Sequence, residues 1–351
     1  MYTRCDGFVI IRPANVRVFR CHAIGLPSKC RGRRVLSAVV LPLVVGAVVL
    51  PLAMHARETQ PPMRCNGHAE LCDRSFDQVV FPATHNSMSN ADDGWTWPFQ
   101  QHGIGQQLND GIRMLLMDSH SWETPRQAAS FGTHLTPRLR STFEAREATS
   151  TPENGVFLCH VMCGLGSTSL VSAMSEVGTF LNTHPDEVLS IFFEDYVAPA
   201  ETAAVFDETG LTHYTFVHTP GAPWPTLREM ISSGHRLLVM SEHRSPPPAW
   251  YQQGWALTQD TSYTVRSPGE FSCALDRGKA GNQLFLLNNW IAKAIPSKVD
   301  AETVNSYAFL LSRARQCEQE RGHVTNFIAV NFYDTGDLMA VVDTLNGVGS
   351  R

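Results

Sequence analysis

Short apolar runs alternate along this chain with longer stretches whose apolar residues recur every three or four positions. The short runs are predicted strands, and each is apolar almost throughout, as expected for parallel strands covered on both faces. We place these strands at Gln78–Phe81, Met114–Met117, Val156–Cys159, Val188–Phe193, Arg236–Met240, Leu284–Leu287 and Phe327–Phe332.

Amphipathic helices fit between the strands. They are predicted at 170–181, after the capping box that begins at Thr226, at 304–317 and at 338–345. Strands that alternate with helices form parallel sheets, and seven or eight such units predict an α/β fold with a single TIM-type (β/α) barrel, closed or incomplete. A doubly wound open sheet is the alternative, but no Gly-x-Gly-x-x-Gly motif opens the first strand–helix turn.

The first 54 residues differ in composition from the rest. Residues 1–34 hold eight of the 28 basic residues and one acid, and residues 35–54 are apolar apart from Ser37. About 20 apolar residues are enough to span a bilayer, and the basic flank keeps the N-terminus cytoplasmic. We therefore expect a basic cytoplasmic region (1–34), a transmembrane or signal segment (35–54), a linker (55–64) and an extracytoplasmic domain (65–351). An uncleaved membrane anchor is favoured over a removed signal that would leave the domain secreted.

The charge of the exported part excludes one class of partner. Only one of the 33 acidic residues precedes residue 35, so the rest of the chain is strongly acidic. Nucleic-acid binding needs a basic face, and we expect no nucleic-acid partner. The same balance disfavours broad adhesion to anionic lipid, which leaves the N-terminal segment as the predicted membrane contact.

Six of the nine cysteines lie in the predicted exported domain. An even number in that compartment indicates three disulfides. Several pairings are open, and proximity along the chain favours Cys65–Cys72, Cys159–Cys163 and Cys273–Cys317. The segment from Cys159 to Cys163, with His160 between them, is alternatively a zinc site, although no second cysteine pair lies nearby.

Several predicted strands end in polar residues that can take part in catalysis or metal binding. In a (β/α) barrel the active site lies at the carboxyl ends of the strands. The polar residues at these ends are His85 and Asn86, Asp118 and His120, His160, Glu194 and Asp195, Glu242 and His243, Asn288 and Asn289, and Asp334.

Five of these residues form a chemically coherent set. His85 and His160 can act as base and acid across one reacting centre. Asn86, Asp118 and Glu194 are oxygen ligands, which suit Ca²⁺ or Mg²⁺ better than zinc. Two histidines beside a hard cation suit phosphodiester cleavage, because the cation neutralises charge that develops on the non-bridging oxygens.

Each candidate also has a structural alternative. His85 or His160 taken singly can be structural, and Asp118 can simply cap the helix after its strand. Trp95 and Trp97 form either a loop over substrate or membrane, or aromatic packing under a long loop. The weaker candidates for substrate binding, as rim residues that shape a pocket, are His120, Glu242, Asn288 and Asp334.

Seven short motifs, taken in the order in which they occur along the chain, resemble the X region of phosphatidylinositol-specific phospholipase C. The likeness is greatest to its secreted or anchored bacterial and fungal branch. The resemblance spans Cys65 to about Gly347 and implies an incomplete TIM barrel. The motifs that carry it are Phe81–Met88, Gln107–Arg113, Asp118–His120, Leu158–His160, Phe193–Tyr196, Leu284–Trp290 and Asn326–Asp334.

The resemblance also implies roles for single residues. His85 would activate the inositol 2-hydroxyl, and His160 would protonate the departing diacylglycerol oxygen. Asn86, Asp118 and Glu194 match positions that hold Ca²⁺ in metal-dependent members, whereas simple bacterial enzymes have an arginine where Asp118 falls.

The chain departs from the metal-dependent pattern at one position. Leu116 stands where those members have another acid, so weak Ca²⁺ binding or replacement by Mg²⁺ is expected. No lysine pair follows the fifth strand, which argues against a preference for polyphosphorylated inositides.

The sequence therefore predicts a phosphoric diester hydrolase of the phosphatidylinositol phospholipase C type. Its expected substrate is a phosphodiester or phospholipid outside the cytoplasm, with Ca²⁺ as cofactor and Mg²⁺ as the alternative. Two other functions stay open: a glycerophosphodiester or lipid phosphodiesterase in which water attacks directly, and a non-catalytic anchored barrel used for binding.

Overall fold

The computed structural model describes residues 63–349 except residue 245. The predicted cytoplasmic region 1–34, the transmembrane or signal segment 35–54 and most of the linker 55–64 lie outside the described residues. Within the described part, no helix is both long enough and apolar enough to cross a membrane.

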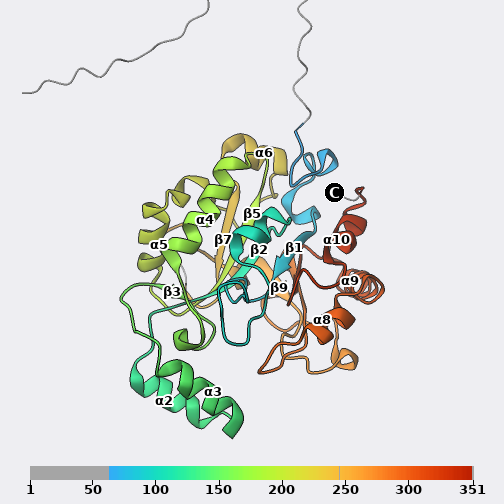
Figure 1. The fold of residues 1–351 in the computed structure, drawn as a ribbon. Coiled ribbons are helices and arrows are strands. Elements are labelled where there is room, and N and C mark those ends of the chain that lie inside the picture. Colours follow the sequence, from blue (N-terminus) through green and yellow to red (C-terminus); the bar gives the residue numbers. More distant parts are fainter. Residues whose placement is uncertain (1–62, 245, 350–351) are drawn as a thin grey trace, which may run out of the picture. The chain divides into compact units, whose positions relative to one another are not determined.

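The domain is built on one sheet (Figure 1). Its strands are β1 (Phe81–Thr84), β2 (Met114–His120), β3 (Phe157–Leu158), β4 (Thr168–Ser169), β5 (Leu189–Asp195), β6 (Thr215–Phe216), β7 (Leu237–Ser241), β8 (Gln252–Gln253), β9 (Thr258–Asp260), β10 (Leu284–Asn289) and β11 (Phe327–Val330). The main path runs β6-β7-β5-β2-β1-β11-β10-β9, and every neighbouring pair on it is parallel.

Helices connect the parallel strands. They are α1 (Ile104–Asn109), α2 (Pro125–Thr133), α3 (Pro137–Glu147), α4 (Leu170–Thr183), α5 (Pro199–Glu208), α6 (Leu227–Ser233), α7 (Gly254–Leu257), α8 (Lys298–Val304), α9 (Tyr307–Arg321) and α10 (Leu338–Asn346). In Figure 1, α4 and α5 flank one arm of the sheet, α8 to α10 flank the other, and α2 with α3 projects away from it near β3.

Alternate strand residues face two separate apolar cores. On β2, Leu115 and Met117 belong to the outer core with the helices, whereas Met114 belongs to the inner core. The inner core also contains Met240 of β7 and Leu284 of β10. Because β7 and β10 lie on opposite sides of β1 in the strand order, the sheet must curl to bring these side chains together.

The curled sheet is not closed into a full barrel by hydrogen bonds. β6 and β9 end the main path, β8 pairs with β7, and the short helix α7 connects β8 to β9. The expected α/β fold with a parallel sheet is confirmed, and its form is a half-barrel. A doubly wound sheet does not fit, since strand side chains from both arms fill one interior.

Two predicted elements are corrected. The apolar run Val156–Cys159 is not a strand of the parallel sheet, because β3 pairs antiparallel with the end of β2 and then with β4. Periodicity alone does not give strand direction. The helix predicted at 304–317 is two helices, since α8 ends at Val304 and α9 begins at Tyr307. The helices predicted at 170–181, after Thr226, and at 338–345 are confirmed as α4, α6 and α10.

The three predicted disulfides are formed. They join Cys65 to Cys72, Cys159 to Cys163, and Cys273 to Cys317. The zinc alternative for the second pair is wrong, because both of its thiols are consumed by the disulfide.

The length of the loop that each disulfide closes predicts that two of them contribute differently to the stability of the fold. Replacing Cys273 and Cys317 by serine should lower the free energy of unfolding by about 4 kcal/mol, because their sequence separation is 44. The same change at Cys65 and Cys72, with a separation of 7, should cost about 2.5 kcal/mol. Urea unfolding of the two double variants measures both values. An equal loss, or a larger loss for the short loop, would contradict the chain-entropy argument.

Candidate active site

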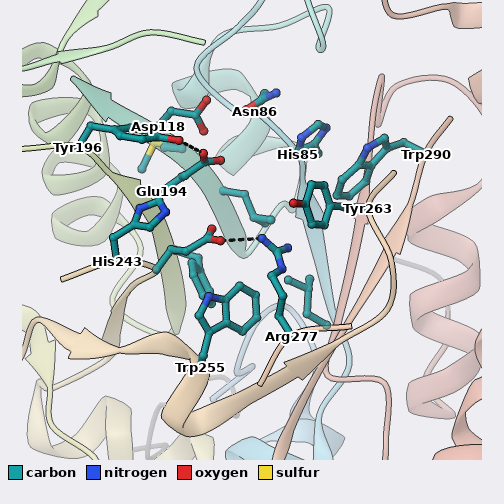
Figure 2. A pocket seen from close by; sticks show the side chains of 15 residues that line it. His85, Asn86, Asp118, Glu194, Tyr196, His243, Trp255, Tyr263, Arg277 and Trp290 are labelled. Atoms are coloured by element: carbon teal, nitrogen blue, oxygen red, sulfur yellow. Dashed lines mark hydrogen bonds and ion pairs between the residues drawn. The ribbon is translucent and has the colours of Figure 1, made fainter. Parts of the chain in front are cut away.

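A cavity of about 310 Å³ opens at the carboxyl ends of the strands (Figure 2). Its wall comes from β2, β5 and β10, from α7 and from loops that follow β1, β5, β7, β9 and β10. The lining residues are His85, Asn86, Leu116, Met117, Asp118, Phe192, Glu194, Tyr196, Glu242, His243, Trp255, Tyr263, Arg277, Leu286 and Trp290. The sheet thus brings together half of the residues predicted from the strand ends, whereas His160 lines a neighbouring hollow.

His85 follows β1 and is held in one orientation. Its backbone N–H donates to Val330 O at 3.0 Å, and its carbonyl accepts from Gln100 Nε2 at 2.7 Å. Its ring lies flat on Trp290, with centroids 3.8 Å apart. Nδ1 lies 2.8 Å from Asn331 Oδ1. An amide oxygen only accepts, so Nδ1 carries the proton and Nε2 keeps a free lone pair.

The surroundings of His85 keep its ring neutral. Burial lowers the pKa of His85 to about 3, and the charges of His160 and Arg277 act in the same direction, while the hydrogen bond with Asn331 opposes them. A neutral imidazole is the form that a general base requires. Because the pKa is lower in the folded state than in the unfolded state, stability from this group is present above pH 6.5 and is lost as the pH falls towards 3.

His160 pairs with Asp118. Its Nδ1 lies 2.8 Å from Asp118 Oδ2, and its side chain is 35 % exposed whereas that of Asp118 is 8 % exposed. The antiparallel return through β3 sets this contact, since the Cys159 N–H donates to Asp118 O at 3.2 Å. The Phe99 ring makes edge contacts with both histidines, at centroid distances of 5.2 Å to His85 and 4.7 Å to His160. Both imidazole rings therefore pack against the same phenylalanine ring.

Glu194 and Asn86 complete the wall on the β2 side. Glu194 Oε1 accepts from the Tyr196 hydroxyl (Figure 2). Burial, together with Glu194, raises the pKa of Tyr196, so this hydroxyl stays a donor. Asn86 is buried in a left-handed conformation (φ 47°), and its Nδ2 has no hydrogen-bond partner among the described residues.

Arg277 was not found from the sequence. Among the described residues that line the cavity, it alone carries a guanidinium or ammonium group. Its guanidinium contacts Asp260 at 2.7 Å and Glu242 at 2.8 Å. It lies between the rings of Trp255 and Tyr263, 4.3 and 4.2 Å from their centroids (Figure 2). No local motif marks this residue, because it comes from an irregular segment between β9 and β10.

Of the four weaker substrate-binding candidates, only Glu242 lines the cavity. Asn288 lies beneath it and donates from Nδ2 to Asp260 Oδ2 at 2.9 Å, which supports the partner of Arg277. His120 stacks on Tyr196 outside the cavity, and burial lowers the pKa of His120 to about 4. Asp334 lies 3.8 Å from the Lys298 ammonium group, also outside.

The charge of the cavity fits a bound cation. Three carboxylates, Asp118, Glu194 and Glu242, face one guanidinium, so the wall has an excess of negative charge. In the described part of the chain, no group of three His, Cys, Asp or Glu residues could hold a metal ion. A cation would therefore need the amide oxygen of Asn86 beside Asp118 and Glu194. Leu116, two residues before Asp118, lines the same cavity. A carboxylate at position 116 would therefore face the cavity together with Asp118.

Known proteins of one family are similar to this chain over most of its length. A model of the PI-PLC X family matches residues 135–346. PI-PLC X domain-containing protein 1 of Arthroderma benhamiae is 26% identical over 332 residues, covering 87% of this chain and 97% of that protein. A PI-PLC X domain-containing protein of Arabidopsis thaliana is 25% identical and covers 85% of this chain and 67% of its own length. An uncharacterized secreted protein of Arthroderma benhamiae is 26% identical over 81% of this chain, which spans 63% of that protein.

Solved structures resemble the chain more distantly. The phosphatidylinositol-specific phospholipase C of Listeria monocytogenes is 14% identical, with a TM-score of 0.46, over 82% of this chain and 96% of that one. A Staphylococcus aureus phosphatidylinositol-specific phospholipase C is 10% identical, with a TM-score of 0.49, over 79% of this chain and 95% of that one.

The neutral state of His85 can be tested by changing its partner. Asn331→Asp should raise the pKa of His85 above its value of about 3, because a carboxylate at Nδ1 stabilises the imidazolium. Asn331→Leu is the matched control and should give no rise. NMR titration of labelled histidines, assigned with His85→Ala, measures the shift. An unchanged His85 titration in Asn331→Asp would contradict the proposed orientation of the ring.

Proposed function

Because the chain belongs to the phosphatidylinositol-specific phospholipase C (PI-PLC) X family, we propose that it is a phosphoric diester hydrolase of the phospholipase C type. The observation that carries this proposal is the pair of histidines on Phe99, His85 neutral and His160 bonded to Asp118, beside an acidic cavity. The three disulfides and a secreted relative support action outside the cytoplasm.

His85 is the proposed general base. Its free Nε2 takes the proton from a substrate hydroxyl next to the phosphate, and that oxygen attacks phosphorus. The bond from phosphorus to the leaving oxygen breaks, and the product is a cyclic phosphate. Asn331 holds the Nδ1 proton throughout this step, at 2.8 Å, so the ring cannot turn away from the substrate.

His160 is the proposed general acid. It gives its Nε2 proton to the leaving oxygen, while Asp118 at Nδ1 stabilises the protonated ring before transfer. In a second step, water opens the cyclic phosphate with the two histidines in reversed roles. The carboxylate partner of His160 and the amide partner of His85 support this assignment of acid and base.

The acidic wall requires a counter-charge for an anionic substrate. Asn86, Asp118 and Glu194 would hold Ca²⁺, or Mg²⁺ in its place, and the ion would neutralise charge on the non-bridging phosphate oxygens. Asp118 can serve both partners, because Oδ2 bonds to His160 and Oδ1 remains for the ion. Arg277 supplies the remaining positive charge in the cavity, and Asp260 and Glu242 fix its position.

The roles of the histidines predict a dependence on the leaving group. On a phosphodiester with an alkyl leaving group, His85→Ala and His160→Ala should each lower kcat/KM by about 10²- to 10⁴-fold. With p-nitrophenolate, which departs without a proton, His160→Ala should lose much less, while His85→Ala keeps its full loss. Initial rates measure this, with the exposed His235→Ala as control.

Two outcomes would change the assignment. Full activity in both histidine variants would show that other groups supply the acid and the base, whereas no turnover of any phosphodiester by the wild type would favour a binding protein. Turnover without a cyclic phosphate in phosphorus NMR would replace the hydroxyl attack by direct attack of water.

The cation site can be tested without turnover. Leu116→Asp should tighten Ca²⁺ binding at least about tenfold, because it adds a carboxylate to the wall that already contains Asp118. Glu194→Gln should weaken binding by a similar factor. Calorimetric titration of the purified proteins with calcium chloride measures both. Affinities that are the same in wild type and in both variants would place any bound Ca²⁺ elsewhere.

A further inference from the structure

A second hollow lies beside the active-site cavity. We call it the apolar pocket; it has a volume of about 240 Å³, and its wall is mainly aromatic and aliphatic. The side chains that define it are Trp95, Trp97, Phe131, Leu135 and Leu139. Phosphodiester chemistry at the histidines makes no use of these groups, so the pocket needs its own explanation.

The pocket is formed by an insertion in the half-barrel. The chain leaves the end of β2, forms α2 and α3, and returns through β3. Thr124 and Thr136 cap the two helices, each followed by a proline at the first helical position. The helices share a small core of their own that includes Phe143 and Leu165. The insertion is therefore held together by its own caps and core, and it forms one wall of the apolar pocket.

The other wall is fixed to the insertion. Arg146 of α3 donates to Thr96 Oγ1 at 2.6 Å and to Gly94 O at 2.7 Å, on either side of Trp95. The Trp95 ring lies directly on Gly166, where an added Cβ would come within 2.4 Å of it. The first contact holds the loop that contains Trp95 and Trp97, here called the tryptophan loop, against the insertion, and the second holds it against the segment that follows β3.

The apolar pocket and the active site meet at His160. His160 and Phe99 are part of the pocket wall, and Phe99 contacts the rings of both histidines. The acidic cavity, with His85, Glu242 and Arg277, lies on the other side of this junction. A leaving oxygen that receives its proton from His160 therefore has the rest of its alcohol next to the pocket.

We infer that the apolar pocket binds an alkyl or acyl chain of the leaving alcohol. The inference rests on the proposed phosphodiesterase function. It assigns the two halves of the substrate to two different hollows, the acidic cavity and the apolar pocket. The polar half that supplies the attacking hydroxyl occupies the acidic cavity. The apolar half of the leaving group lies between the tryptophan loop and the α2–α3 insertion, where burial of each methylene favours binding.

A series of soluble substrates tests the inference. Inositol phosphodiesters of glycerol and of 1-O-butyl-, hexyl- and octylglycerol are compared below the concentrations at which they aggregate. In wild type, kcat/KM should rise by roughly fourfold for each buried methylene until the pocket is filled. Leu139→Asp should flatten this rise, so that the alkylglycerol diesters lose more of their kcat/KM than the glycerol diester does. Leu139 lines the pocket but lies outside the small core of the insertion.

Two further variants control the experiment. Ala145→Asp places the same charge on an exposed position of α3 and should keep the chain-length dependence. Ala294→Trp, at an exposed position in the pocket wall, should fill the space without adding charge and should reduce the dependence as Leu139→Asp does. A flat profile in wild type would overturn the inference, as would an unchanged profile in both pocket variants.

A binding measurement separates this inference from the proposed function. Calorimetric titration with 1-O-octylglycerol and with glycerol needs no turnover. Octylglycerol should bind wild type far more tightly than glycerol, and both Leu139→Asp and Ala294→Trp should remove the difference. If no phosphodiester is cleaved but this pattern holds, the proposed function fails and the pocket assignment stands. Octylglycerol that binds wild type no better than glycerol overturns the assignment, whatever the activity.

Discussion

The hydrogen bond between His160 and Asp118 is the contact on which the rest of the site depends. It joins the end of β2 to an excursion of the chain that includes α2, α3 and β3. The antiparallel ladder between β2 and β3 and the Cys159–Cys163 disulfide restrict this excursion on both sides of His160. The proposed acid is thereby held near His85, although about 75 residues separate them in the chain. The same contact places His160 where the acidic cavity and the apolar pocket meet.

The two histidines differ because their partners differ. Asn331 can orient His85 but cannot balance a positive charge on it, so burial dominates and the pKa of His85 falls to about 3. Asp118 can balance a positive charge on His160. The proposed assignment of base and acid therefore rests on one amide partner and one carboxylate partner. Of the remaining carboxylates of the cavity, Glu194 accepts from the Tyr196 hydroxyl and Glu242 pairs with Arg277.

Much of the site could be predicted from the sequence because a parallel strand ends visibly in a pattern of apolar and polar residues. His85, Asn86 and Glu194 were found in this way. His160 was found by the same rule, although β3 runs antiparallel, since its apolar run also ends at the active-site edge. Arg277 and the role of Asn331 could not be predicted. Arg277 lies in no periodic pattern, and Asn331, although it lies within the predicted strand Phe327–Phe332, acts through a contact with the distant His85. The break between α8 and α9 was missed because apolar spacing continues across it.

The α2–α3 insertion changes what the half-barrel can select. The strands of the half-barrel and the loops between them contain the histidines, the carboxylates and Arg277, which we propose to act on the polar atoms around the phosphate. The insertion has its own small core and its own helix caps, so its pocket-facing side chains can vary without disturbing the strands. In this proposal, headgroup chemistry and leaving-group length are recognised by two separate hollows, with Phe99 and His160 at their junction. A substitution at Leu139 should therefore alter which alcohols leave efficiently, whereas a substitution at Arg277 should alter which polar groups bind.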